Sequence, residues 1–148
     1  MVAATYATVV SFGVRSTPVT QGSFQVFHRR GAKACVVNLV SDNDKRLKQW
    51  RRLVETQARN AMKGRAPFAS AVQVQLIFWM PTPKVHRGKT WAAVRGRNDL
   101  DKMLRACMDA MTTAAVYADD GLVARIETEK RWCQANEKPG VDVLVEAL

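Results

Sequence analysis

The chain has 148 residues, of which 47% are hydrophobic and 24% are charged, with 8 Gly and 5 Pro. This length and composition predict one globular domain over residues 1–148 and exclude a low-complexity chain. The net charge of +10 and the pI near 10.1 argue against an enzyme of neutral metabolites. Such an excess of positive charge favours a polyanionic partner, with nucleic acid ahead of a membrane surface.

Hydrophobic periodicity, followed in chain order, predicts five strands and two helices. Residues 5–14 are rich in β-branched side chains and form the first expected strand, and residues 34–40 form the second. Between them, residues 15–33 carry a proline and two glycines and are expected to form a long basic loop or a loose hairpin. Ser41 then begins the first helix, because its Ser-x-x-Asp opening is close to a capping box.

The first helix has one apolar stripe that runs to about Met62, and Gly64 and Pro67 end the helix. Its opposite face is basic, which is typical of a solvated surface and also suits phosphate: Lys45, Arg46, Lys48, Arg51, Arg52 and Arg59. Residues 72–80 alternate between apolar and polar side chains and predict a half-buried strand. The glycines and scattered cations of residues 82–98 predict a mobile loop.

The second helix is expected over residues 100–113, followed by strands over 124–129 and 141–145. The resulting order, roughly ββαβαββ, predicts a mixed α+β fold with two main helices. No segment has the composition of a linker, and no internal repeat is present.

The three cysteines, Cys35, Cys107 and Cys133, are far apart in the chain and odd in number. With His28 and His86 they form no pattern of zinc-ligand spacing, so we interpret them as reduced thiols. No run of ~18 apolar residues is present, and the N-terminus lacks a charged leader. We therefore expect a protein of the cytoplasm, bacterial or that of a host if the chain is viral, without a membrane partner.

One stretch, RNDLDKMLRACMDAMTTAAVYADD over residues 97–120, holds five of the 13 acidic residues. On the second helix, at ~100° per residue, Asp101 and Arg105 lie ~40° apart on the polar flank. Asp99 stands at or just before the first turn. Two interpretations compete. The aspartates are either punctuation, as helix caps, an i,i+4 ion pair and a turn, or they are ligands of a divalent metal.

The metal interpretation depends on where the strand after Gly121 lies. If that strand runs beside the start of the second helix, Asp120 joins Asp99 and Asp101. Three carboxylates around one point repel each other, and a hard cation such as Mg²⁺ relieves that repulsion. A metal ion held in this way can activate water and neutralise charge on a leaving oxygen. A basic surface beside an acidic metal pocket is the charge arrangement of a nuclease.

The same residues resemble the RusA family of Holliday junction resolvases. The family pattern is an Asp-x-Asp, a helix reading roughly Leu-x-Lys-Ala-x-x-Asp-Ala-Leu, and an Asp-Asp before a strand. Here Asp99-Leu100-Asp101 is followed by MLRACMDAM over residues 103–111 and by Asp119-Asp120. The sharp match covers residues 97–126.

The resemblance implies a small homodimeric endonuclease that nicks four-way DNA junctions symmetrically and depends on Mg²⁺, with Mn²⁺ as a substitute. By position, Asp99, Asp101 and Asp120 would be the catalytic, metal-binding carboxylates, while Asp109 and Asp119 would be supporting residues. The chain departs from the family pattern with Arg105 in place of the usual Lys, Lys102 in place of Asn, and Asn98 where a basic residue is common. Arginine stays protonated, so Arg105 is expected to neutralise phosphate charge and cannot be a base.

The sequence thus predicts a metal-dependent endonuclease of branched DNA, acting in recombination and repair. The residues expected to grip the DNA backbone are Lys84, Arg87, Lys89, Arg95, Arg97 and Lys102, and Trp91 either stacks on an unpaired base or folds onto the core. Ile77 and Trp79 are candidates for a dimer face. Two alternatives stay open: a non-catalytic nucleic-acid-binding module, and a less selective metal nuclease of flaps, forks or RNA hybrids.

Overall fold

The computed structural model describes residues 9–21, 24–28, 37–41 and 44–148 of the chain. Its elements, in chain order, are β1 (Val9–Val14), β2 (Phe24–His28), β3 (Val37–Ser41), α1 (Asp44–Met62), β4 (Val72–Met80), a 3₁₀ turn (Lys84–His86), α2 (Leu100–Thr113), a 3₁₀ turn (Asp120–Leu122), β5 (Val123–Trp132) and β6 (Gly140–Ala147). The mixed α+β fold with two main helices is therefore confirmed.

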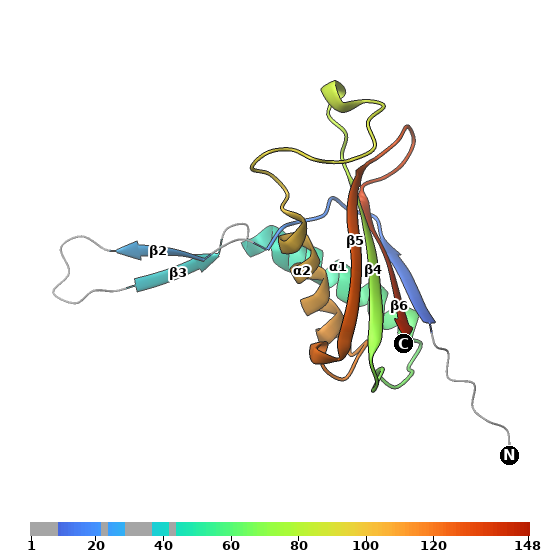
Figure 1. Cartoon of the computed structure of the whole chain (residues 1–148). Helices are drawn as coiled ribbons and strands as arrows, with labels where there is room; N and C mark the ends of the chain where they lie inside the picture. The colour runs from blue at the N-terminus through green and yellow to red at the C-terminus, as the bar shows by residue number, and fades with distance from the viewer. Residues whose placement is uncertain (1–8, 22–23, 29–36, 42–43) are drawn as a thin grey trace, which may run out of the picture.

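The main sheet has four strands in the order β1-β6-β4-β5, and β2 and β3 form a separate antiparallel pair that extends to one side (Figure 1). β1 and β4 both pair antiparallel with β6, whereas β5 runs parallel to β4. A parallel neighbour requires a crossover connection, and the chain between β4 and β5 supplies it with α2. β5 is consequently an edge strand of the main sheet.

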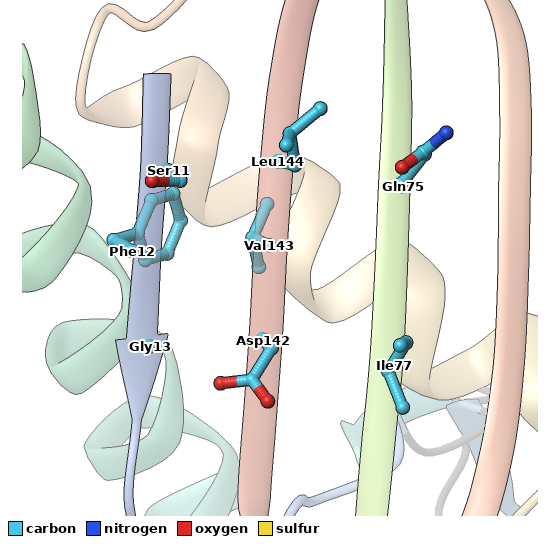
Figure 2. Close-up of a pocket in the computed structure, with 8 residues that line it drawn as sticks. All are labelled: Ser11, Phe12, Gly13, Gln75, Ile77, Asp142, Val143 and Leu144. Atoms are coloured by element: carbon cyan, nitrogen blue, oxygen red, sulfur yellow. The ribbon is translucent and has the colours of Figure 1, made fainter. Parts of the chain in front are cut away.

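Both helices cover one face of the sheet, and the core lies between them and the strands (Figure 1). The apolar stripe expected on α1 is buried, with Trp50 at 1% and Val54 at 0% exposure. The stripe of α2 is buried as well, through Met103, Cys107 and Met111. The other face of the sheet has no helix over it, and there the side chains of Ile77 and Leu144 lie beside polar ones (Figure 2).

Several boundaries differ from the sequence-based expectation. The first helix begins at Asp44 and not at Ser41, because Ser41 is the last residue of β3 and pairs with Phe24. Within the described part of residues 15–33 there is one strand, β2, and it pairs with β3 beyond that range, so the hairpin extends past residue 33 and adds a strand to the predicted order. β5 and β6 are both longer than the expected strands over 124–129 and 141–145. Residues 5–8 and 34–36 of the first two expected strands lie outside the described ranges.

The segment over residues 82–98 packs against the end of β5. His86 stacks on the buried ring of Trp132, with centroids 5.1 Å apart and an interplanar angle of 12°. Further along, the backbone N–H of Ala92 donates to the carbonyl of Lys130 at 3.2 Å. The segment is therefore tied to the edge strand immediately before it enters α2.

Candidate active site

The entry to α2 places two carboxylates at the start of the helix. Asn98 has a φ of 53°, a left-handed conformation that asparagine adopts more readily than most residues. Asp99 follows at the N-cap position and Asp101 lies in the first turn. The partial positive charge of a helix N-terminus favours both carboxylates there.

The fold does not use these carboxylates as caps. The Asp99 side chain makes no capping hydrogen bond, and its Oδ2 lies 3.5 Å from the Nζ of Lys102. Asp101 is exposed and makes no hydrogen bond or ion pair with any described residue. Asp99 thus occupies the N-cap position and Asp101 the first turn, as the punctuation interpretation expects, but among the described residues neither side chain makes a capping hydrogen bond and Asp101 makes no i,i+4 ion pair.

Arg105 lies one helical turn beyond Asp101 and is exposed. Both side chains are described, and no ion pair joins them. The guanidinium therefore stays available to an external anion on the same flank of α2 as Asp101.

Asp109 and Asp119 are held by the fold. Asp109 Oδ2 pairs with Arg51 at 2.7 Å and so links α2 to α1. Asp119 accepts a hydrogen bond from the backbone N–H of Gly121 at 2.6 Å, which closes the turn before β5. A Cβ at position 121 would lie 2.8 Å from that carboxylate oxygen, so a larger residue there would displace the Asp119 side chain. The turn interpretation is correct for Asp119.

Asp120 lies at the opposite end of α2 from Asp99 and Asp101. α2 has 14 residues, and a helix of that length spans about 21 Å. β5 begins at Val123, and only its far end reaches the helix start, where Lys130 Nζ donates to the carbonyl of Asn98 at 2.7 Å. From Val123 to Lys130 the strand rises by about 23 Å, at ~3.3 Å per residue.

The length of α2 and the rise of β5 each indicate that Asp120 lies about 20 Å from Asp99 and Asp101 within one chain. The strand after Gly121 starts at the wrong end of α2 to bring them together, because β5 is parallel to β4 and antiparallel to α2 (Figure 1). Accordingly, the described ranges contain no group of three or more His, Cys, Asp or Glu residues placed to hold a metal ion. In one copy of the chain, Asp99 and Asp101 lie at the start of α2 and Asp120 lies beyond its other end.

Burial raises the pKa of Tyr117 to about 12, and the negative charges of Asp120 and Asp109 add to this effect. The protonated hydroxyl donates to the carbonyl of Met108 at 3.0 Å. Tyr117 thereby fixes the chain three residues before Asp120 against the C-terminal half of α2.

The cations expected to grip DNA lie in the segment that leads into α2. Their side chains are exposed, and none of them forms an ion pair with a described residue: Lys84, Arg87, Lys89, Arg95 and Arg97. Lys102 is half-buried, beside Asp99, and its carbonyl accepts from the N–H of Gln21 at 3.2 Å. The basic segment thus leads directly into the two carboxylates at the start of α2, of which Asp99 has only Lys102 as a partner and Asp101 has none among the described residues.

The basic face of α1 is divided. Arg51 and Arg59 are held by the fold, the latter at 2.7 Å from Glu55 and 3.3 Å from the carbonyl of Thr113. Arg46 and Arg52 instead line a groove of about 510 Å³ on the flank of α1. Another groove, of about 530 Å³, lies on the open face of the sheet and contains none of the aspartates of residues 97–120 (Figure 2).

The model of the family "Endodeoxyribonuclease RusA" matches residues 17–146, nearly the whole chain. The chain belongs to the RusA family. It is therefore an endodeoxyribonuclease, and membership of the family implies Holliday junction resolvase activity, which in RusA proteins generally depends on a divalent metal. A search of curated proteins gave no match. In the described part of this RusA-family chain, no helix has the length and apolar character needed to cross a membrane.

Proposed function

We propose that this protein resolves four-way DNA junctions by paired, symmetric nicks that depend on Mg²⁺. The observation that carries the proposal is the start of α2, where Asp99 and Asp101 stand beside an exposed basic loop and are not consumed by the fold. Like charges at one place disfavour each other, one lysine at 3.5 Å offsets this only in part, and a hard cation bound through oxygen is a ligand that suits them.

The donor set at this place fits Mg²⁺. The ion prefers oxygen ligands and usually takes only one or two protein carboxylates, leaving positions for water and phosphate oxygens. Asp99, Asp101 and Asp120 would hold it, and when bound it would supply an activated water and neutralise phosphate charge. Mn²⁺ offers similar coordination chemistry and is expected to substitute.

The protein's own contribution to catalysis is electrostatic. Arg105 faces solvent one turn beyond Asp101, so its guanidinium can hold the scissile phosphate and stabilise charge that develops on its oxygens. Lys102 lies beside Asp99 and adds a second cation on the other side. Because arginine does not lose its proton, Arg105 would not serve as a general base.

We further propose that the site is completed by a second copy of the chain. Asp120 lies a full helix length from Asp99 and Asp101. A two-fold axis perpendicular to α2 would set two copies of the helix antiparallel, and this brings Asp120 of the partner subunit to the Asp99–Asp101 end. A C2 dimer then has two equivalent sites, which matches the near two-fold symmetry of a four-way junction.

The surface that fits this dimer is the edge formed by α2 and β5. β5 is unpaired along its outer side before Lys130 in the described structure, and Ile126 is 43% exposed there. Leu104 and Met108 of α2 are only partly buried. We favour this edge over the Ile77–Trp79 face, because dimers stacked through the open face would keep both α2 helices on the outside and Asp120 far from the pair.

A mixing experiment tests the shared site. Asp101→Asn and Asp120→Asn are each expected to abolish cutting when purified alone. Mixed and re-equilibrated in equal amounts, half of the dimers are heterodimers with one intact site, so about a quarter of all sites should cut, as single nicks. If each chain carried its own complete site, the mixture would stay inactive. A monomer at micromolar concentration would also contradict the proposal.

The activity itself is tested by nicking of a labelled four-way junction beside a linear duplex of the same sequence, with Mg²⁺ and with chelator. Paired cuts near the crossover, absent in chelator, are the expected result. Equal cutting of both substrates would identify a less selective nuclease. Binding without cutting in several divalent metals would instead identify a binding module.

Backbone contacts from Lys84, Arg87, Lys89, Arg95 and Arg97 should make junction binding fall steeply with salt. The buried Cys107 and the partly buried Cys133 are free thiols, as in a reducing compartment. Together with the polyanionic substrate, they support action in the cytoplasm.

A further inference from the structure

Trp91 is an exposed aromatic residue in the middle of the basic segment. Its side chain is 58% exposed, whereas the rings of Trp50 and Trp132 are buried at 1% and 4%. The alternative that Trp91 folds onto the core is therefore wrong. An exposed indole is an unusual use of the largest apolar side chain, and its surroundings indicate what it is for.

The backbone at Trp91 is fixed to the edge strand. Trp91 forms an isolated antiparallel bridge with Arg131 of β5. The N–H of Trp132 donates to the carbonyl of Thr90 at 2.9 Å, and the N–H of Ala92 donates to that of Lys130. The position of the indole is thus set by the sheet and not by a free loop.

The ring itself rests on a guanidinium. The Cζ of Arg131 lies 5.4 Å from the centroid of the Trp91 ring and 5.9 Å from that of Trp79. Arg131 is held in turn by Glu129 at 2.6 Å. The indole N–H of Trp79 donates to Asp142 of β6 at 2.8 Å, and this hydrogen bond fixes the Trp79 ring against β6.

These contacts form a ladder across the sheet, defined by Trp91, Arg131, Trp79 and Asp142. A guanidinium over an aromatic face is attracted by the ring, so the ladder holds the Trp91 indole in one orientation. With one face on Arg131 and more than half of its surface exposed, the indole offers a preformed flat apolar surface to a ligand. A group that stacks there does not have to order the ring first.

The ladder lies on the open face of the sheet at its edge strand, and Lys130, the residue before Arg131, connects this edge to the start of α2. The carbonyl of Lys130 accepts from Ala92, while its Nζ donates to the carbonyl of Asn98. The exposed cations Lys89, Arg95 and Arg97 flank Trp91 in the chain. A flat apolar surface surrounded by cations suits a ligand that has both a planar ring and phosphates, which is a nucleotide in a strand.

We propose that Trp91 is a stacking site for a single unstacked nucleobase at the branch point of the DNA. This inference rests on the proposed function for its substrate and adds how the substrate is recognised. In a continuous duplex the base faces are covered by their neighbours, whereas unstacking costs least where a duplex is already interrupted. Trp91 would then strengthen the binding of branched DNA and have little effect on the binding of linear duplex.

The test compares Trp91→Ala with Trp91→Phe, which keeps an aromatic face, and with Leu148→Ser, which removes another exposed apolar side chain at 59% exposure. Binding is measured with Ca²⁺ in place of Mg²⁺, to suppress cutting, on a four-way junction and a linear duplex, each with 2-aminopurine at successive positions. Trp91→Ala should lose about tenfold in junction affinity, within the range for one stacked base, and less than about twofold on duplex. Trp91→Phe and Leu148→Ser should stay close to wild type.

Two readouts separate stacking from a charge effect. In the wild type, 2-aminopurine at one position near the crossover should change its fluorescence on binding, and Trp91→Ala should abolish that change. The dependence of junction affinity on salt should keep its slope in Trp91→Ala, because no phosphate contact is lost, whereas Lys89→Gln should reduce the slope by about one contact.

Three results would overturn the inference: unchanged junction affinity of Trp91→Ala, an equal loss on junction and duplex, or a change in oligomeric state by light scattering, which would make Trp91 a subunit contact. These results are distinct from failure of the proposed function. If the wild type binds junctions with a Trp91-dependent fluorescence change and never cuts, catalysis fails and stacking stands. If the wild type cuts junctions and Trp91→Ala binds them normally, stacking alone fails.

Discussion

The five aspartates between Arg97 and Gly121 fall into two groups that differ in what holds their carboxylates. Asp109 and Asp119 are engaged, the first with Arg51 at 2.7 Å and the second with a backbone N–H at 2.6 Å. Asp101 and Asp120 make no hydrogen bond or ion pair with described residues, and Asp99 has only a lysine at 3.5 Å. The five aspartates lie on one helix and the turn after it, but only two of their carboxylates are held by close contacts within the fold.

We propose that the engaged group belongs to the fold and the unengaged group to a ligand. Removing an engaged carboxylate should lower stability, and should affect the activity only where that carboxylate positions an unengaged one. Removing an unengaged one should lower the activity and spare the stability. The following predictions test that separation, beginning with the largest effect.

Asp101→Asn should lower the rate of junction cutting by at least about 100-fold, because it removes a charge that the proposed metal site needs and keeps the side-chain shape. Its stability to urea should change by less than about 1 kcal/mol, since only the interaction with the helix dipole is lost. Cutting by Asp101→Asn at the wild-type rate would return this aspartate to a structural role.

The buried side of the same helix supplies a stability effect that is independent of the carboxylates. Burial raises the pKa of the Cys107 thiol to about 12 from 9.0, and the Trp50 indole offsets this only in part. A raised thiol pKa contributes stability that is fully present below the unfolded-state pKa and is lost as pH rises through the folded-state value. Burial of Tyr117 acts in the same direction.

Wild-type stability should therefore fall above about pH 9, by roughly 2 kcal/mol at pH 10.5 at 1.36 kcal/mol per pH unit. Cys107→Ala, which has no thiol to ionise, should show a flatter decline in urea unfolding over the same range. It should also lose about 1 kcal/mol at neutral pH from the small cavity. Parallel stability curves for the two proteins would contradict the assignment.

Asp119→Ala should lower stability by about 1 kcal/mol and cutting by about tenfold, because the carboxylate closes the turn that presents Asp120. Asp119→Asn keeps an oxygen that accepts from Gly121 and should recover most of both losses. A different result would show that the charge of Asp119 itself takes part in the site: Asp119→Asn would restore stability but cut as slowly as Asp119→Ala.

Asp109→Asn should have the smallest effect, a loss of about 0.5 kcal/mol in stability with cutting within twofold of wild type. The ion pair with Arg51 is more than a third exposed on both sides, which limits its value. Arg51→Gln and the double variant complete a thermodynamic cycle, and urea unfolding should give a coupling energy of the same size. A large loss of cutting in Asp109→Asn with normal stability would contradict the assignment of Asp109 to the aspartates that serve the fold.

The sequence alone predicted the elements whose signals are local. α2 was expected over residues 100–113 and spans Leu100–Thr113, and residues 72–80 form β4 as expected. In both cases the spacing of apolar side chains within the element indicates whether it is a helix or a strand and which of its sides is buried. The aspartate motif likewise pointed to the RusA family, which the family model confirms. The residues proposed for the site stay predictions, and their arrangement could not be read from the sequence.

Only the tertiary structure decided how those candidates lie relative to one another. The parallel pairing of β4 with β5 sends the chain back along α2 and puts Asp120 about 20 Å from Asp99 and Asp101. The ladder beneath Trp91 depends in the same way on residues from three strands and a loop. Strand order and cross-strand contacts arise between residues far apart in the chain, so no local window contains them. Local patterns fix which groups a helix and a strand carry, and long-range pairing fixes which of those groups can act together.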